Sequence, residues 1–143
     1  MKTAGIAVLG ILATGVALPT LADSLPMDTA VTLSGIETVC TGIGSSKDES
    51  IWSQYPVRVE FSNGGSQYLA GAHVTLSGRM TTPVTFDCQG SWVLFRLPAG
   101  KYKVTAVMAS APNGPSASTI FVTSGSGPQK RVELQFPHVA SNQ

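Results

Sequence analysis

The sequence has little charge and few of the side chains on which most catalytic and metal sites depend. Charged residues make up 12% of its 143 residues, and it contains only two histidines and two cysteines. Long runs of helix-forming residues are absent too, whereas glycine, serine, threonine and proline are plentiful. These shortages argue against a helical fold and against a sequence cluster of metal ligands, and they favour a β-rich chain.

The N-terminus has the pattern of a secretory signal peptide. Lys2 precedes residues 3–18, which are uncharged and mostly apolar, and residues 19–22 place small side chains where a signal peptidase cleaves. We expect residues 1–22 to be removed and the mature chain to be periplasmic or secreted. An uncleaved anchor is the alternative, since residues 3–22 carry no charge. No later segment is apolar enough to span a bilayer.

Without Lys2 the chain has no formal net charge, and its length suits one domain. A neutral chain gives no electrostatic reason to expect nucleic acid or an anionic membrane as a partner. We expect a flexible lead-in over residues 23–30, a single β-sandwich domain over 31–137 and a C-terminal tail over 138–143.

The two cysteines, Cys40 and Cys88, are predicted to form a disulfide. Exported proteins keep disulfides, and a pair leaves no thiol over. Closing a loop of about 49 residues stabilises the fold by about 4 kcal/mol in the chain-entropy model. A catalytic thiol or a metal ligand is the alternative reading, and it requires a nearby histidine; none is close in sequence.

Alternation of apolar and polar residues predicts about seven short strands, after a first extended segment over residues 31–41. Strands with one buried face need a second sheet to cover that face, so we predict an all-β, antiparallel two-sheet sandwich of the prealbumin or immunoglobulin-like class. The side chains expected to point inward are Val57, Val59, Phe61, Ala72, Val74, Leu76, Val84, Phe86, Cys88, Val93, Phe95, Leu97, Tyr102, Val104, Ala106, Met108, Ile120, Val122, Val132, Leu134 and Phe136.

Two short segments interrupt this alternation. Residues 97–100 read Leu-Pro-Ala-Gly, where Pro98 ends one strand and Gly100 permits a tight corner into the next. Residues 46–54 are predicted to form a short helix, because Ser46 and Glu49 have capping-box spacing. Ile51, Trp52 and Tyr55 are then expected on one side of that helix.

The segment from Tyr55 to Phe136 resembles the carboxypeptidase regulatory-like domain, a prealbumin (transthyretin-like) β-sandwich. The resemblance rests on the runs "GAHVTLSG", "CQGSWVLFRLPAGKYKVTAVM" and "KRVELQF". The preceding run "TGIGSSKDES" is similar to the start of stand-alone exported bacterial versions of this module. The resemblance implies a sandwich fold and an accessory, non-catalytic role, and it supports the fold better than the function.

The sequence lacks the motifs on which the activities of related proteins depend. The zinc peptidases that such modules accompany use a His-x-x-Glu ligand pair, and neither His73 nor His138 has glutamate at that spacing. Transthyretin relatives that hydrolyse 5-hydroxyisourate end in Tyr-Arg-Gly-Ser, whereas this chain ends "FPHVASNQ". A serine-hydrolase elbow and a phosphate loop are also missing, and Asp48 and Glu49 suit helix capping better than paired-acid catalysis.

Metal binding is a remote alternative. Exported sandwiches can bind copper through histidine and methionine, but the two histidines and Met27, Met80 and Met108 are not clustered in sequence. We therefore expect no metal and no cofactor.

An apolar outer face is the most informative irregularity. Trp92 and Leu94 alternate with the inward residues of their strand, and Phe121 falls on the solvent side by the same parity. We favour an interpretation in which the short helix covers this face, because large exposed apolar patches are rare on monomers. The alternative is a binding surface for a protein, or an aromatic platform for a sugar, with Trp52 and Tyr68 as further candidates.

These patterns lead to two hypotheses of different classes. The first is a non-catalytic exported module that binds or stabilises another envelope protein. The second is a module that binds carbohydrate or another small ligand, for which we expect two coplanar exposed aromatic side chains. An enzyme would instead need His73 or His138 beside a carboxylate and a nucleophile in a cleft.

Overall fold

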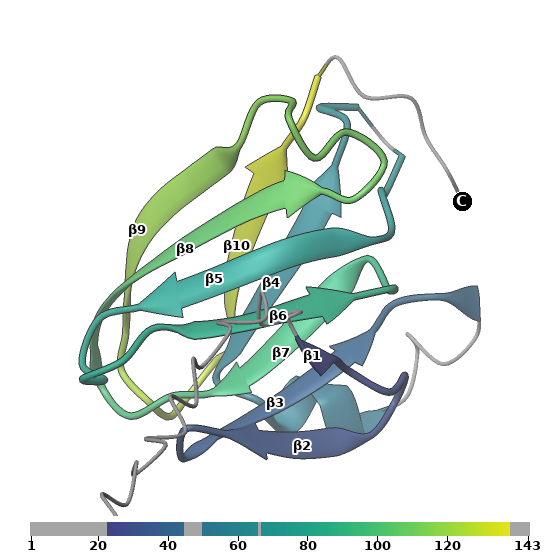
Figure 1. Cartoon of the computed structure of the whole chain (residues 1–143). Coiled ribbons are helices and arrows are strands. Elements are labelled where there is room, and N and C mark those ends of the chain that lie inside the picture. Colours follow the sequence, from purple (N-terminus) through teal and green to yellow (C-terminus); the bar gives the residue numbers. More distant parts are fainter. Residues whose placement is uncertain (1–22, 45–49, 66, 138–143) are drawn as a thin grey trace, which may run out of the picture.

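The part of the chain that the structure describes forms two five-stranded β-sheets. The two sheets pack face to face (Figure 1). The computed structural model describes residues 23–44, 50–65 and 67–137. This architecture confirms the all-β, two-sheet sandwich expected from the alternation. No helix in the described part of the chain has the length and apolarity needed to cross a bilayer.

Each sheet is named here after a strand at one of its edges. The β9 sheet has the order β1-β6-β5-β8-β9, and the β10 sheet has the order β10-β4-β7-β3-β2. The strands of the β9 sheet are Asp23–Ser24 (β1), Val84–Cys88 (β6), Ala72–Ser77 (β5), Gly100–Met108 (β8) and Ala117–Thr123 (β9). The strands of the β10 sheet are Lys130–Gln135 (β10), Val57–Ser62 (β4), Trp92–Arg96 (β7), Ile36–Thr41 (β3) and Ala30–Leu33 (β2).

The core between the sheets contains nearly all of the inward residues that alternation predicts. Those of β4 to β8, together with Val132, Leu134 and Phe136, are buried in one continuous cluster. Phe86 and Phe95 meet edge to face across the sandwich, with 6.0 Å between ring centroids. Side-chain phase along a strand is therefore enough to specify most of the core.

The N-terminal part differs from the expectation in two ways. Residues 23–30 are not a loose lead-in, because β1 pairs with β6 and Leu25 is buried in the core. The predicted segment 31–41 is not continuous, because a turn at Ser34 and Gly35 folds it into β2 and β3. Both turn residues have positive φ, 48° and 81°, the conformation of a tight two-residue hairpin.

Two strand pairs are parallel, whereas the sequence predicted an antiparallel sandwich throughout. β10 runs parallel to β4, in register from Lys130 opposite Val57 to Gln135 opposite Ser62. β1 runs parallel to β6. Parallel pairing needs a long connection, and here the intervening chain builds most of the sandwich. Alternation identifies the buried face of a strand but not its direction.

Strand β9 has the opposite phase from the one predicted. Phe121 points into the core, whereas Ile120 and Val122 point outward and remain 59% and 63% exposed. Register explains the correction: Phe121 lies opposite the inward-facing Tyr102, and the two rings stack with centroids 5.9 Å apart. Directly opposed residues share a face, so the buried Tyr102 determines which face Phe121 takes.

The corner at residues 97–100 has the expected role. Pro98 and Ala99 separate β7 from β8, and the Tyr102 hydroxyl donates a hydrogen bond to the Pro98 carbonyl, at 2.8 Å. Gly125 approaches from the β9–β10 connection, at a φ of 76°, and a Cβ there would lie 2.8 Å from the Ala99 amide nitrogen. A side chain at position 125 would therefore disturb the corner.

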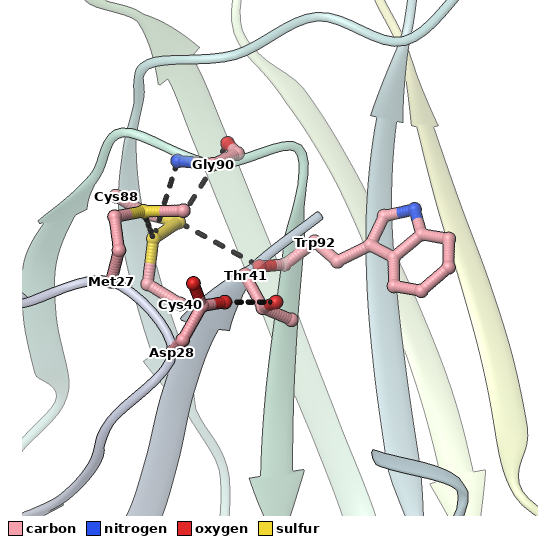
Figure 2. Close-up of a disulfide and its surroundings, with 7 residues drawn as sticks. All are labelled: Met27, Asp28, Cys40, Thr41, Cys88, Gly90 and Trp92. Carbon is pink, nitrogen blue, oxygen red and sulfur yellow. Dashed lines mark hydrogen bonds between the residues drawn. A yellow bond between two sulfur atoms is a disulfide. The ribbon is translucent and has the colours of Figure 1, made fainter. Parts of the chain in front are cut away.

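The predicted disulfide is present and joins the two sheets. Cys40 of β3 and Cys88 of β6 are both fully buried, with a Cα–Cα distance of 5.6 Å. Figure 2 shows the sulfur atoms beside Met27 and Gly90; the Gly90 amide donates to Cys40 Sγ at 3.3 Å, and Met27 Sδ lies 3.5 Å from that atom. A Cβ at position 90 would collide with the Thr41 carbonyl, so this close approach requires glycine.

Candidate functional site

The aromatic surface considered from the sequence does not exist as an exposed surface. Leu94 is fully buried, Trp52 and Phe121 are also buried, and Trp92 is only 8% exposed. Tyr68 is half-buried. The five side chains therefore offer no shared exposed patch to a partner, which argues against the alternative of a binding surface at Trp92 and Leu94.

Leu94 is covered by the short helix, as the favoured interpretation held. The structure describes a 3-10 helix over Ser50–Gln54, while Ser46 and Glu49, which carried the capping prediction, lie outside the described residues. Trp52 and Tyr55 pack with Val39 and Leu94 in a small cluster separate from the main core. Ile51, expected on the same side, is exposed instead.

A hydrogen-bonded group closes this small cluster against solvent. The Tyr55 hydroxyl donates to Glu37 Oε2 at 2.5 Å, and the Arg96 guanidinium lies 4.6 Å above the Tyr55 ring and 3.5 Å from the same carboxylate. The hydrogen bond from Tyr55 lowers the pKa of Glu37. Burial, helped by the neighbouring carboxylate, raises the pKa of Tyr55 to about 12.

Trp92 is covered by a second group on the same outer face. The Arg58 guanidinium lies 4.1 Å above the Trp92 ring centroid, a cation–π contact. Tyr68 meets the indole edge to face, with ring planes 82° apart and centroids 6.0 Å apart. A sugar platform needs open, coplanar rings, and this pair has neither property.

Glu60 holds the second group together, although it alternates with the inward-pointing Val59 and Phe61 and so lies on the outer face of β4. It is 4% exposed and accepts two hydrogen bonds from Arg131, at 3.0 and 3.1 Å. Arg58 Nε lies 2.7 Å from Glu60 Oε2, and the Tyr68 hydroxyl donates to Glu60 Oε1 at 3.2 Å. The hydrogen bonds to Glu60 raise the pKa of Arg131. This carboxylate is therefore neutralised by two guanidinium groups within the protein.

His73 is the one described histidine, and it pairs with a carboxylate. Its Nδ1 lies 2.7 Å from Asp87 Oδ1, on the outer face of the β9 sheet, and both side chains are well exposed. The described residues contain no group of three or more histidine, cysteine, aspartate or glutamate side chains placed to hold a metal ion. His138 lies outside the described residues.

An open groove lies between two sheet edges among the described residues. It has a volume of about 420 Å³ and runs between β9 and β10, which lie side by side on one flank of the sandwich in Figure 1. Its walls are residues 119–122 of β9 and 130–133 of β10. A smaller hollow of about 270 Å³, lined by Glu60 and residues 131–133, continues it along β10.

The β9 wall of this groove is a free and unprotected sheet edge. β9 is seven residues long, pairs only with β8 among the described strands, and has the sequence ASTIFVT, without charge or proline. The other edges are short or charged: β1 has two residues, β2 has four, and β10 carries Lys130, Arg131 and Glu133. Proteins normally guard long edges with charge, proline or bulges, and β9 has none of these guards.

Sequence reasoning missed this edge because it assigned Ile120 and Val122 to the core. One signal was visible nonetheless: residues 104–129 contain no charged side chain, although they include a whole strand. A long uncharged stretch around a strand of β-branched residues is the composition expected of an edge that pairs with another chain.

Comparison with known proteins assigns no family. No family model matches the chain, and no curated protein matches its sequence. The fold is compatible with the immunoglobulin-like and prealbumin-like class of β-sandwiches, and the geometry of the chain itself carries the functional argument.

Proposed function

We propose that this protein is a non-catalytic exported module that binds an extended segment of another envelope protein along β9. The observation that carries the proposal is the unguarded edge, where Ile120 and Val122 are more than half exposed on a strand with one free side. Addition of a strand at such an edge satisfies free backbone groups and covers exposed β-branched side chains at the same time.

The groove supports strand addition because it gives the added segment a second contact surface. Side chains of a strand alternate between faces, so a segment next to β9 would place every second side chain toward β10. Those side chains would meet the wall formed by residues 130–133. The other side chains would lie beside Ile120 and Val122 on the outer face.

Export is part of the proposal. The disulfide is typical of an oxidising compartment, and the N-terminal pattern predicts a cleavable signal peptide, so we place the mature chain in the periplasm or outside the cell. An accessory role also agrees with the resemblance to carboxypeptidase regulatory-like domains. The non-catalytic part of the proposal is supported by Glu60, a well-buried ionisable group whose contacts are with arginine and tyrosine side chains of the protein itself.

The test combines affinity capture with hydrogen exchange. The mature protein is used to capture partners from the native envelope, beside a double variant, Ile120→Ser with Val122→Ser, that removes the two exposed aliphatic side chains. The expected result is a specific partner captured by the wild type and lost from the double variant. Binding of that partner should also slow amide exchange in β9 by at least tenfold.

A matched control separates edge recognition from general loss of apolar surface. Ile43→Ser with Ile51→Ser removes two isoleucines that are also about half exposed, one shortly after β3 and one in the 3-10 helix, neither of them in β9. This control should retain the partner. Equal capture by all three proteins, or slower exchange elsewhere with no change in β9, contradicts the proposal.

A further inference from the structure

The surroundings of the β9 edge are positively charged, although the mature chain is neutral. Lys101 and Lys103 of β8 lie directly opposite Val122 and Ile120 of β9, and all four positions lie on the outer face of the β9 sheet. Lys130 lines the groove from β10. None of the ion pairs among the described residues involves these three lysines.

Nearby carboxylates offset only part of this charge. Glu60 is paired with two arginines, and Glu133, which lines the groove with Lys130, accepts a hydrogen bond from the Ser62 hydroxyl at 2.7 Å. Asp87 lies on β6, separated from β8 by β5, and is paired with His73. The sequence shows the same asymmetry, since six basic and only two acidic residues follow Phe61.

From this arrangement we infer that the segment added to β9 is acidic, with carboxylates at alternate positions on the outer face. The inference rests on the proposed function, because it describes the chemistry of the partner at the same edge. Residues of the added strand on the outer face would lie next to Ile120 and Val122, and one strand further from Lys101 and Lys103.

Distance and side-chain length permit this contact. Neighbouring strands are about 4.8 Å apart, so an added strand lies about 10 Å from β8. A lysine side chain and a glutamate side chain are both long and flexible, and together they can bridge that span above Ile120 or Val122. The side chains facing the groove would meet a mixed lining, in which Phe121 and Val132 are apolar and Lys130, Arg131 and Glu133 are charged. The inference therefore concerns the outer face, where the predicted segment carries acidic residues at alternate positions.

The inference is tested with a random peptide library displayed on phage and selected against the mature protein. Selected peptides should carry Asp or Glu at alternate positions, and they should lose binding to the Ile120→Ser, Val122→Ser double variant. For the best synthetic peptide, Lys101→Gln with Lys103→Gln should weaken affinity by about three- to tenfold at low salt. The charge-conserving pair Lys101→Arg with Lys103→Arg should retain most of the affinity.

The outcomes separate the inference from the proposed function. Peptides that need Ile120 and Val122 but are neutral or basic, or that ignore loss of the lysines, overturn the acidic segment and leave the docking edge in place. The absence of any peptide that depends on Ile120 and Val122 overturns both. A wild-type dimer that the double serine variant converts to monomer assigns the edge to a second copy and also overturns the inference.

Discussion

The outer faces of the two sheets differ in whether their outward-pointing apolar side chains are covered. On the β10 sheet, Trp92 and Leu94 point away from the core but are covered by arginine, tyrosine and the 3-10 helix. On the β9 sheet, Ile120 and Val122 also point away from the core and stay exposed. The apolar side chains of the first face are covered by other residues of the same chain. The second face ends at β9, which has a described neighbour on one side only.

This contrast shows where a binding surface can and cannot be found on a sandwich. An outward tryptophan attracts attention in a sequence, but long charged side chains on neighbouring strands can bury it with their methylene stems and stacked guanidinium groups. Two smaller aliphatic residues attract less attention, and a strand at the edge has only one neighbour to cover them. Accessibility depends on neighbours across the sheet, which a single strand does not reveal.

The largest effect should come from breaking the covalent link between the two sheets. Replacing Cys40 and Cys88 with alanine should lower the free energy of unfolding by about 4 kcal/mol, because a loop of about 49 residues is no longer closed in the unfolded chain. Urea unfolding followed by tryptophan fluorescence measures the loss. The wild type under reducing conditions should show a similar loss, and unchanged stability would mean that the core alone holds the sheets together.

Removal of the buried carboxylate should destabilise the covered face next. Glu60→Gln leaves Arg58 and Arg131 close together without their shared counter-charge and should cost about 3 kcal/mol of unfolding free energy. Glu133→Gln is the matched control on the exposed side of β10 and should cost about 0.5 kcal/mol. Equal losses for the two variants would show that burial of Glu60 has no energetic consequence.

Loss of the Tyr55 hydroxyl should have a smaller effect that depends on pH. Tyr55→Phe removes the hydrogen bond to the partly exposed Glu37 and should cost about 1 kcal/mol near neutral pH. The measurement compares the free energies of unfolding of the wild type and the variant from about pH 3 to about pH 11, a range chosen for the titration of Glu37 and Tyr55.

The direction of this pH dependence follows from the shifted pKa values of Glu37 and Tyr55. The lowered pKa of Glu37 stabilises the fold above about pH 4.5, and this contribution is lost as the pH falls through the folded-state value. The raised pKa of Tyr55 means that the unfolded chain ionises first, so stability declines as the pH rises from 10 towards 12. The advantage of the wild type should therefore shrink at both ends, and a difference that stays constant with pH contradicts the described contact.

The smallest effect on stability should come from the exposed edge. Ile120→Lys should change the free energy of unfolding by less than about 0.5 kcal/mol, because the side chain already lies in solvent. Ile51→Lys, at a position 52% exposed on the 3-10 helix, should behave alike. A loss above about 1 kcal/mol for Ile120→Lys alone would mean that position 120 is buried and that the phase of β9 is the one expected from the sequence.

Strong alternation made most of the fold predictable. Strands β4, β5, β6 and β8 each show mainly one apolar parity between turn residues, so their inward sets could be read directly, and Cys88 fell in the inward phase of its strand. Ser34 and Gly35 are residue types that favour a tight turn. They were not predicted as a turn because apolar residues on both sides suggested one continuous extended segment.

The candidate site was less predictable for a physical reason. In β9 both parities contain apolar residues, so alternation alone could not choose between Phe121 and the pair Ile120 and Val122; the ring of Tyr102 on the neighbouring strand made the choice. Burial of Glu60 was hidden in the same way, since its two arginines come from positions 58 and 131, far apart in the chain. For both Phe121 and Glu60, residues on neighbouring strands determine that the side chain is buried.

The disulfide also divides the chain into a closed ring and two arms. Residues 40–88 form the ring, which includes the 3-10 helix, β4, β5 and β6, while β7 to β10 extend from Cys88 as one arm. A protease that cuts once at the Gly64-Gly65 turn would leave every strand attached to a single molecule until a reductant separates the pieces. The β9 edge would therefore stay covalently attached to the rest of the sandwich after such a cut.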